Sequence, residues 1–274
     1  MEKQTVTHVL LSQKDAPDKV SRKNGHIYCP VCGHRQTYKL SDGRRQCKSC
    51  QRKFTPHGRK PRLSKEAINE IARLFWLLVP AARVAVDMGV NYNTVLKYYA
   101  RLRTGISEQR EREIGQLDGE VEVDESYFGG VRKGKRGRGA AGKIPVFGLL
   151  KRNGEVRVVF PKDVKRDTLE GAIRKHVKPQ SWVYSDCYTA YDKLSVHGFH
   201  HGRVNHSEKF GNGKTHINGI ENFWGFAKRR LKLYHGGYKK NFRLFIREME
   251  FRFNHRNDDK ALDYLTKLLT AGPN

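Results

Sequence analysis

The first strongly patterned part of the chain has the hydrophobic spacing of helices. Apolar residues recur at intervals of three and four after Ser64, whose short polar side chain suits a helix N-cap, and Pro80 ends the run. This pattern predicts a first helix over about 65–78. A short second helix follows over 81–88 and ends at Gly89.

A third helix is predicted from an N-cap at Asn91 or Asn93 through Leu102. With Gly89 at the preceding turn, the three helices over 62–105 are typical of a helix-turn-helix. A plain three-helix packing unit with a solvated basic face is the alternative. The side chains that would reach base edges and phosphates are Asn91, Asn93, Thr94, Lys97 and Arg101.

Alternation with a period of two begins after the charged segment 106–118, where a domain boundary is predicted. Val121 and Val123 fall on one face of the segment, and Glu122 and Asp124 fall on the other. Such a pattern is typical of a half-buried strand.

The later elements complete an α/β domain over 117–257. They are predicted as strands 144–150 and 155–160 joined by an Asn153-Gly154 hairpin, a helix from Asp167 or Thr168 to about 177, a strand 182–184, and helices 188–194, 217–232 and 242–256. The strand at 182–184 should lie parallel to the first. This order describes an RNase H-like fold, a mixed sheet with flanking helices. The stretch between the helices at 188–194 and 217–232 reads as irregular, and 1–20 and 258–274 read as tails.

The charge balance indicates the kind of partner. The chain has 54 Lys and Arg against 28 Asp and Glu, a formal net charge of +26. This excess predicts a polyanionic partner, either nucleic acid, a membrane surface or an acidic protein. No stretch approaches the roughly 18 apolar residues of a membrane helix, and the first residues lack a signal-peptide pattern, so we expect an intracellular protein.

Four of the five cysteines form two CxxC pairs, Cys29 with Cys32 and Cys47 with Cys50. Two such pairs supply the four thiolates that a structural zinc ion prefers. We therefore expect a zinc ribbon over 21–56. Its many basic residues favour contacts with phosphates.

Carboxylates in a basic chain indicate a second kind of metal site. Phosphodiester chemistry uses divalent cations held by hard oxygen ligands. The candidates are Asp124 on the first strand, Asp186 after the parallel strand, and Glu221 on a late helix. Glu122 is an alternative to Asp124, and Asp186 could instead cap a helix, as Glu221 could be an ion-pair partner.

Basic residues near these acids are candidates for binding DNA. Lys228 is seven residues after Glu221 and shares its helical face, and Arg229 follows it. A glycine-rich basic loop over 131–143 carries Arg132, Lys133, Lys135 and Arg136. Other residues have a structural interpretation instead: Cys187 as a small buried side chain, Phe223, Trp224 and Phe226 as core more than base-stacking residues, and His197, His200, His201, His206 and His216 as polar or DNA-facing residues.

Three motifs carry a resemblance to a known family. They are Val-Asp124-Glu-Ser-Tyr-Phe-Gly-Gly, Ser185-Asp186 after a short strand, and Ile-Glu221-Asn-Phe-Trp with Lys228. Over about 119–257 the chain resembles the DDE-type transposases of bacterial insertion sequences related to the Merlin elements. Members of that group commonly have an N-terminal zinc ribbon or helix-turn-helix.

The resemblance implies metal-dependent strand cleavage at element ends, followed by attack of the freed 3′-hydroxyl on target DNA. Asp124, Asp186 and Glu221 would hold Mg²⁺ or Mn²⁺, as two ions, and Asn218 or Asn222 would be weaker candidates for the third ligand. The partners would be double-stranded DNA at terminal repeats and target, and further copies of the chain on that DNA, in the bacterial cytoplasm at the nucleoid and without a membrane. The alternative is a non-catalytic DNA-binding regulator or a domesticated remnant.

Overall fold

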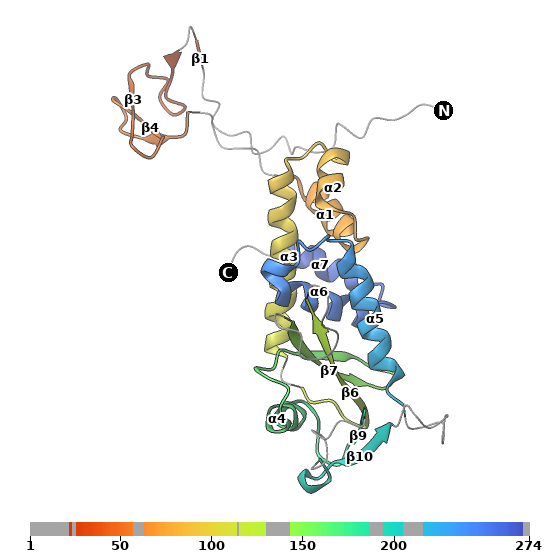
Figure 1. The fold of residues 1–274 in the computed structure, drawn as a ribbon. Coiled ribbons are helices and arrows are strands. Elements are labelled where there is room, and N and C mark those ends of the chain that lie inside the picture. Colours follow the sequence, from red (N-terminus) through yellow and green to blue (C-terminus); the bar gives the residue numbers. More distant parts are fainter. Residues whose placement is uncertain are drawn as a thin grey trace, which may run out of the picture. The chain divides into compact units, whose positions relative to one another are not determined.

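The computed structural model describes residues 22–23, 26–56, 63–113, 115–129, 143–186, 194–204 and 216–270 (Figure 1). They fall into two compact units, one within Met1–Leu96 and Leu269–Asn274 and the other within Lys97–Leu268. No helix in these ranges combines the length and the apolar character needed to span a bilayer. The predicted tail over 1–20 and, but for Lys143, the predicted basic loop lie outside the described residues, including Arg132, Lys133, Lys135 and Arg136.

A small β domain holds the paired cysteines. Its strands are β1 (Arg22–Lys23), β2 (His26–Ile27), β3 (Thr37–Lys39), β4 (Arg45–Cys47) and β5 (Lys53–Phe54). β1 pairs antiparallel with β2, and β3, β4 and β5 form an antiparallel sheet. Its core consists of Cys29, Cys47 and Phe54, with Ile27 and Cys50 packed against them. A core this small rarely stabilises a domain without a metal or a disulfide.

Three helices follow, as the sequence predicts: α1 (Lys65–Trp76), α2 (Ala81–Asp87) and α3 (Tyr92–Arg112). Ser64 Oγ accepts a hydrogen bond from the Ala67 backbone N–H at 3.2 Å, which confirms Ser64 as the N-cap of α1. Gly89 has a φ of 62° between α2 and α3. Asn91 Oδ1 accepts a hydrogen bond from the Asn93 N–H at 2.9 Å, so Asn91, and not Asn93, caps α3.

Helix α3 is longer than its sequence pattern indicates. It continues to Arg112, into the segment 106–118 where a boundary was predicted. Ile106 is buried there, and Arg110 Nε donates to Glu250 Oε1 at 2.8 Å. Because these stabilising contacts come from residues far along the chain, the local composition did not predict them.

The second unit is built on a five-stranded mixed sheet. Its strands are β6 (Glu120–Phe128), β7 (Ile144–Lys151), β8 (Val156–Val159), β9 (Trp182–Asp186) and β10 (His200–Val204). The order is β10-β9-β6-β7-β8, with β7 antiparallel to both neighbours and β6, β9 and β10 parallel. This order and these directions confirm the RNase H-like fold. The hairpin is confirmed too, since Asn153 has a φ of 57°.

Helices cover both faces of the sheet (Figure 1). They are α4 (Arg166–His176), α5 (Asn218–Lys232) and α6 (Phe242–Asn254), and a last helix, α7 (Ala261–Thr270), contacts α6 through Tyr264 and Phe251. α4 packs on the face that carries Val121 and Val123, and α5 and α6 pack on the opposite face. β6 is therefore buried on both sides, so the expectation of a half-buried strand is wrong, and Glu122 is only 1% exposed.

The free edge of the sheet at β8 is covered by side chains of α6. Asn254 accepts from the Val156 N–H at 2.8 Å and donates to the Val156 carbonyl at 2.9 Å. Glu250 Oε1 accepts from the Val158 N–H at 3.0 Å, and Arg247 donates to the Val158 carbonyl at 2.8 Å. These side chains satisfy backbone groups that a neighbouring strand would otherwise pair.

Some expected elements differ from the structure. β10 lies in the stretch read as irregular, and α7 lies within the segment read as a tail. Helix α4 begins after Lys165, and Asp163, not Asp167 or Thr168, accepts the hydrogen bonds at its start. The helix predicted over 188–194 lies outside the described residues except at Leu194, which begins a 3₁₀ turn, and Lys239–Asn241 forms a second such turn.

Candidate active site and zinc site

The three predicted acids lie on neighbouring elements of the second unit. Asp124 is in the middle of β6, Asp186 ends β9, and Glu221 is in the first turn of α5. β6 and β9 are parallel neighbours in which Glu122 pairs with Tyr184. Asp124 and Asp186 each follow two residues after that pair, so they are level with each other on the same side of the sheet.

The charges of these acids act on one another. Burial, together with the negative charges of Glu125, Asp186 and Glu221, raises the pKa of Asp124 to about 7. Like charges around a half-buried carboxyl group disfavour its ionised form, and a cation between them would relieve the repulsion. The carboxylates do not form a closed ligand set: within the described part of the chain, only the cysteines already lie close enough together to hold an ion.

Lys228 lies beside this acidic group. Its Nζ is 5.6 Å from the centre of the Phe128 ring, at the end of β6. Burial and the charge of Lys143 lower its pKa, while attraction to Asp124 opposes that shift. Arg229 and the two asparagines that flank Glu221, Asn218 and Asn222, are exposed on α5.

The structure distinguishes Glu122 from Asp124, which the sequence did not. Glu122 Oε2 accepts the backbone N–H of Ile220 at 2.9 Å, and its Oε1 accepts Arg152 Nε at 3.0 Å. The side chain also lies 3.3 Å from His216 Nδ1. Glu122 is thus committed to protein partners, and it ties the strand of Asp124 to the start of the helix that carries Glu221.

Arg152 completes this connection and was not predicted from the sequence. It donates to the His216 carbonyl at 2.7 Å, and its guanidinium carbon lies 3.9 Å from the centre of the Tyr184 ring. Gly219 allows the close approach, because a Cβ there would lie 2.8 Å from Glu122 Oε2. The sequence offered two signals for this connection. One is a second acid, Glu122, on the same strand face as Asp124, and the other is a glycine, Gly219, two residues before Glu221.

The cysteine sulfurs converge in the small β domain. All four Sγ atoms lie within 4.8 Å of one another, and the pairs Cys29–Cys50 and Cys32–Cys47 are 3.6 Å apart. Burial of Cys47 opposes its ionisation, but hydrogen bonds from the backbone of Cys50 and Ser49 and from neighbouring thiols lower its pKa to about 7. Four converging thiols with backbone donors suit a tetrahedral zinc ion.

The other predicted contact residues have mixed environments. Asn91, Asn93 and Lys97 are exposed, whereas Thr94 and Arg101 are half-buried. Phe223 and Trp224 belong to the core, and Phe226 packs against it. The unassigned residues are placed as follows: His197 against Glu170, His200 on Trp182, His201 on Ser185, and Cys187 and His206 outside the described residues.

Comparisons with known proteins identify the chain's relatives. A curated Haemophilus influenzae protein described as an uncharacterized transposase-like protein is 41% identical over 115 residues, 42% of this chain and 94% of the relative. Crystal structures of the Mos1 strand transfer complex and of the Mos1 mariner paired end complex with Mn are 13% and 12% identical, with TM-scores of 0.27 and 0.26 over 78% of this chain and 80% of theirs.

The family model described as the ISXO2-like transposase domain matches residues 116–254, which include the whole mixed sheet, α5 and α6. Since this match spans more than half of the chain, and the bacterial relative is matched over nearly its full length, the protein belongs to the family of ISXO2-like transposases.

Proposed function

We propose that this transposase binds the ends of its insertion sequence and carries out metal-dependent DNA strand cleavage and strand transfer. The observation that supports this proposal best is the placing of a largely buried Asp124 near Asp186 and Glu221: burial, with the negative charges of Glu125, Asp186 and Glu221, raises the pKa of Asp124 to about 7. Acids brought together at this cost are typical of sites that gather cations.

The residues have distinct roles in this proposal. Asp124, Asp186 and Glu221 would hold two Mg²⁺ or Mn²⁺ ions, which supply stabilisation of the attacking and leaving oxygens when bound. Binding would draw the three carboxylates closer together than they lie here. Lys228, beside Asp124, would hold a DNA phosphate near them.

The N-terminal modules would bind the terminal repeats. The four cysteines would hold zinc and so fold the ribbon, and the exposed side chains at the start of α3 would contact DNA. We expect the protein to act as an oligomer on that DNA.

The test is cleavage of a labelled duplex that carries the element's own end, resolved on a denaturing gel with and without Mg²⁺. We expect Asp186→Asn to lower the cleavage rate by about 10³-fold or more while the Kd for DNA stays close to wild type, because only metal binding is lost. Asp259→Asn, which makes the same charge change at an exposed position after α6, should cleave normally.

Cleavage by Asp186→Asn at the wild-type rate would remove Asp186 from the site. Specific binding by the wild-type protein without cleavage in Mg²⁺ or Mn²⁺ would instead favour a non-catalytic regulator.

A further inference from the structure

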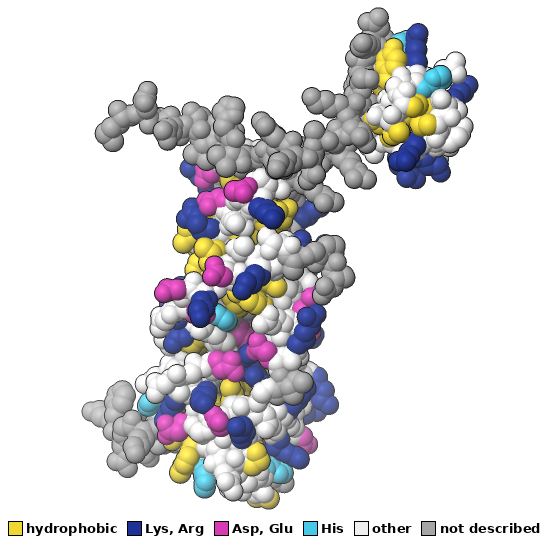
Figure 2. All heavy atoms as spheres, turned by 180° about the vertical axis from the view of Figure 1, so that it is seen from behind, with side chains coloured by type: hydrophobic (Ala, Val, Ile, Leu, Met, Phe, Trp, Pro, Cys, Tyr) yellow, Lys and Arg dark blue, Asp and Glu magenta, His cyan; other side chains and the backbone are white. Residues whose placement is uncertain are grey.

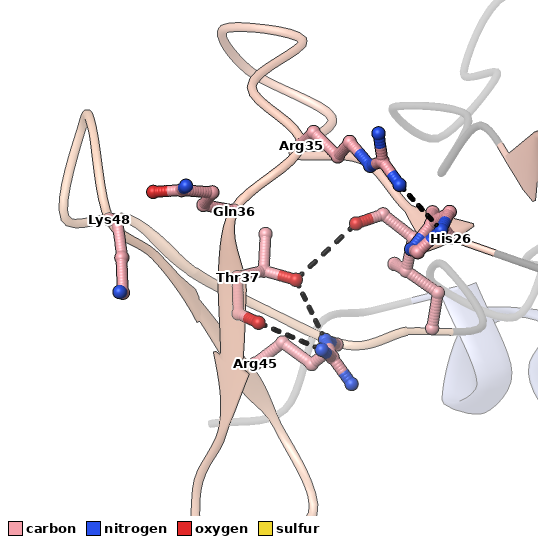
Figure 3. A pocket seen from close by; sticks show the side chains of 7 residues that line it. His26, Arg35, Gln36, Thr37, Arg45 and Lys48 are labelled. Atoms are coloured by element: carbon pink, nitrogen blue, oxygen red, sulfur yellow. Dashed lines mark hydrogen bonds between the residues drawn. The ribbon is translucent and has the colours of Figure 1, made fainter.

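The ribbon carries a hollow of about 470 Å³ that the cysteine site does not use (Figure 3). It is lined by His26 and Ile27 of β2, Arg35 and Gln36 of the following loop, Thr37 of β3, Arg45 of β4, and Lys48. Its volume falls within the range of about 300–1,000 Å³ that is usual for ligand pockets. None of the described residues that line it is acidic.

Two of its cationic groups are held in place by hydrogen bonds. Arg45 donates from Nε to Thr37 Oγ1 and from Nη2 to the Thr37 carbonyl, both at 2.8 Å. Arg35 donates from Nη2 to His26 Nε2 at 2.7 Å. Figure 3 shows these guanidinium groups on either side of Thr37. Donors fixed before a ligand arrives lose less entropy on binding.

Lys48 also lines the hollow, and its backbone holds two segments of the ribbon together. Its N–H donates to the Gln36 carbonyl at 3.0 Å, which holds the segment after β4 against the segment before β3. The β3–β4 register also pairs Thr37 with Cys47. The hollow is therefore built on the strand that ends in a cysteine ligand, so metal binding and formation of the hollow are coupled.

In the described part of the ribbon, no carboxylate pairs with the cations of this hollow. Arg35, Arg45 and Lys48 are cationic, and Asp42, which is the only acid over 26–56, pairs with Arg44 at 2.7 Å instead. On the face drawn in Figure 2 the ribbon shows Lys, Arg and His side chains without acidic ones, whereas the larger body shows both signs. Guanidinium groups bind phosphate oxygens through paired hydrogen bonds.

We propose that this hollow is a phosphodiester site that holds the DNA backbone, with Arg35, Arg45 and Lys48 as the phosphate-binding groups. The identity of the ligand as DNA rests on the proposed function, whereas the anion site itself rests on the ribbon alone. The site gives a function to three of the ribbon's basic residues, which line one hollow.

The test measures binding of full-length, zinc-loaded protein to a fluorescent element-end duplex by anisotropy, across a salt series and without Mg²⁺. The pocket variant is Arg35→Gln with Lys48→Gln, which leaves the Arg45–Thr37 bonds in place. The control variant is Lys39→Gln with Arg52→Gln, two exposed ribbon residues outside the hollow. Zinc content per chain verifies that both variants keep the ribbon folded.

We expect the pocket variant to bind DNA about tenfold more weakly, with a salt slope shallower by about 1–2, and the control to lose less than about threefold. Equal losses in the two variants would overturn the proposal, because only net charge would then matter. Binding to polyglutamate, measured in the same way, is the comparison for an acidic protein partner. If the pocket variant kept its affinity for DNA and lost its affinity for polyglutamate, the proposal would also be overturned, in favour of such a partner.

This experiment separates the two proposals. Because binding is read without divalent ions, a protein that never cleaves DNA can still show the pocket effect, and the phosphate site would then stand while the catalytic proposal fails. If instead the wild-type protein cleaves DNA normally, and the pocket variant binds DNA as well as the control variant does, the phosphate site is refuted and the catalytic proposal stands.

Discussion

At the scale of single residues, Asp124 lowers the stability of the folded protein when it ionises, and the same ionised group is the one proposed to bind a divalent cation. Its pKa is raised from 3.8 to about 7 by burial and by the charges of Glu125, Asp186 and Glu221. The folded state thus holds this proton more tightly than the unfolded state does. Stability is therefore lost as pH rises from about 4 through about 7, where the folded protein must ionise the group.

We predict that Asp124→Asn stabilises the protein when divalent ions are omitted. At pH 8 the variant should gain on the order of 1–4 kcal/mol, because the ionised acid is removed, and at pH 5.5 it should gain less. Denaturant unfolding at the two pH values measures this difference, without a chelator that would strip the cysteine site. Mg²⁺ should stabilise the wild type and not the variant. A variant less stable than wild type at pH 8 would contradict the pKa argument.

The sequence could suggest the three acids but could not separate Asp124 from Glu122. Both lie on one face of β6, and a period of two treats them alike. What distinguishes them is the Ile220 N–H, which comes from a residue 98 positions away in the sequence. Only the packing of α5 on the sheet determines which of the two carboxylates accepts a hydrogen bond from a backbone N–H.

At the scale of elements, long alternating or helical patterns were predictable and short paired segments were not. β6, β7 and β8 carry enough apolar residues to be recognised, whereas β10 (His200–Val204) contains a single large apolar residue and exists through its pairing with β9. α7 has buried residues at Ala261, Leu265 and Leu269, a helical spacing that was present in the sequence but was read as a tail.

Glu122 connects two such elements, and we predict a large effect of removing it. Glu122→Ala should lower the free energy of unfolding by about 3–5 kcal/mol, because it leaves Arg152 and the Ile220 N–H without their buried acceptor. Glu122→Gln keeps one oxygen acceptor and should cost less. Urea unfolding of the three proteins measures the order. A loss below about 1 kcal/mol for the alanine variant would show that α5 is anchored by other contacts.

At the scale of the whole molecule, the chain combines cores of very different size. The Lys97–Leu268 unit has extensive hydrophobic layers on both faces of its sheet, whereas the described part of the ribbon has only three buried apolar residues. The CxxC spacing made the ribbon predictable, and the succession of strands and helices along the chain made the sheet predictable except for β10. The continuation of α3 to Arg112 was not, because Arg110 is stabilised by Glu250, 140 residues later.

The difference between the cores predicts that the ribbon and the Lys97–Leu268 unit unfold independently of each other. Cys47→Ser should abolish stoichiometric zinc binding and unfold the ribbon, since metal binding there supplies the folding free energy. The main thermal transition of the Lys97–Leu268 unit should stay within a few degrees of wild type. Zinc analysis with differential scanning calorimetry tests both statements. Full zinc content in the variant would exclude Cys47 as a ligand.

The α6 side chains along β8 have a consequence for behaviour at high concentration. Asn254, Glu250 and Arg247 occupy the backbone groups of Val156 and Val158 that a strand from another molecule would use. A chain that lost the Asn254 amide would offer those groups to its neighbours. The damage would then grow with protein concentration, as self-association by strand addition, and a stability measurement on dilute protein would underestimate it.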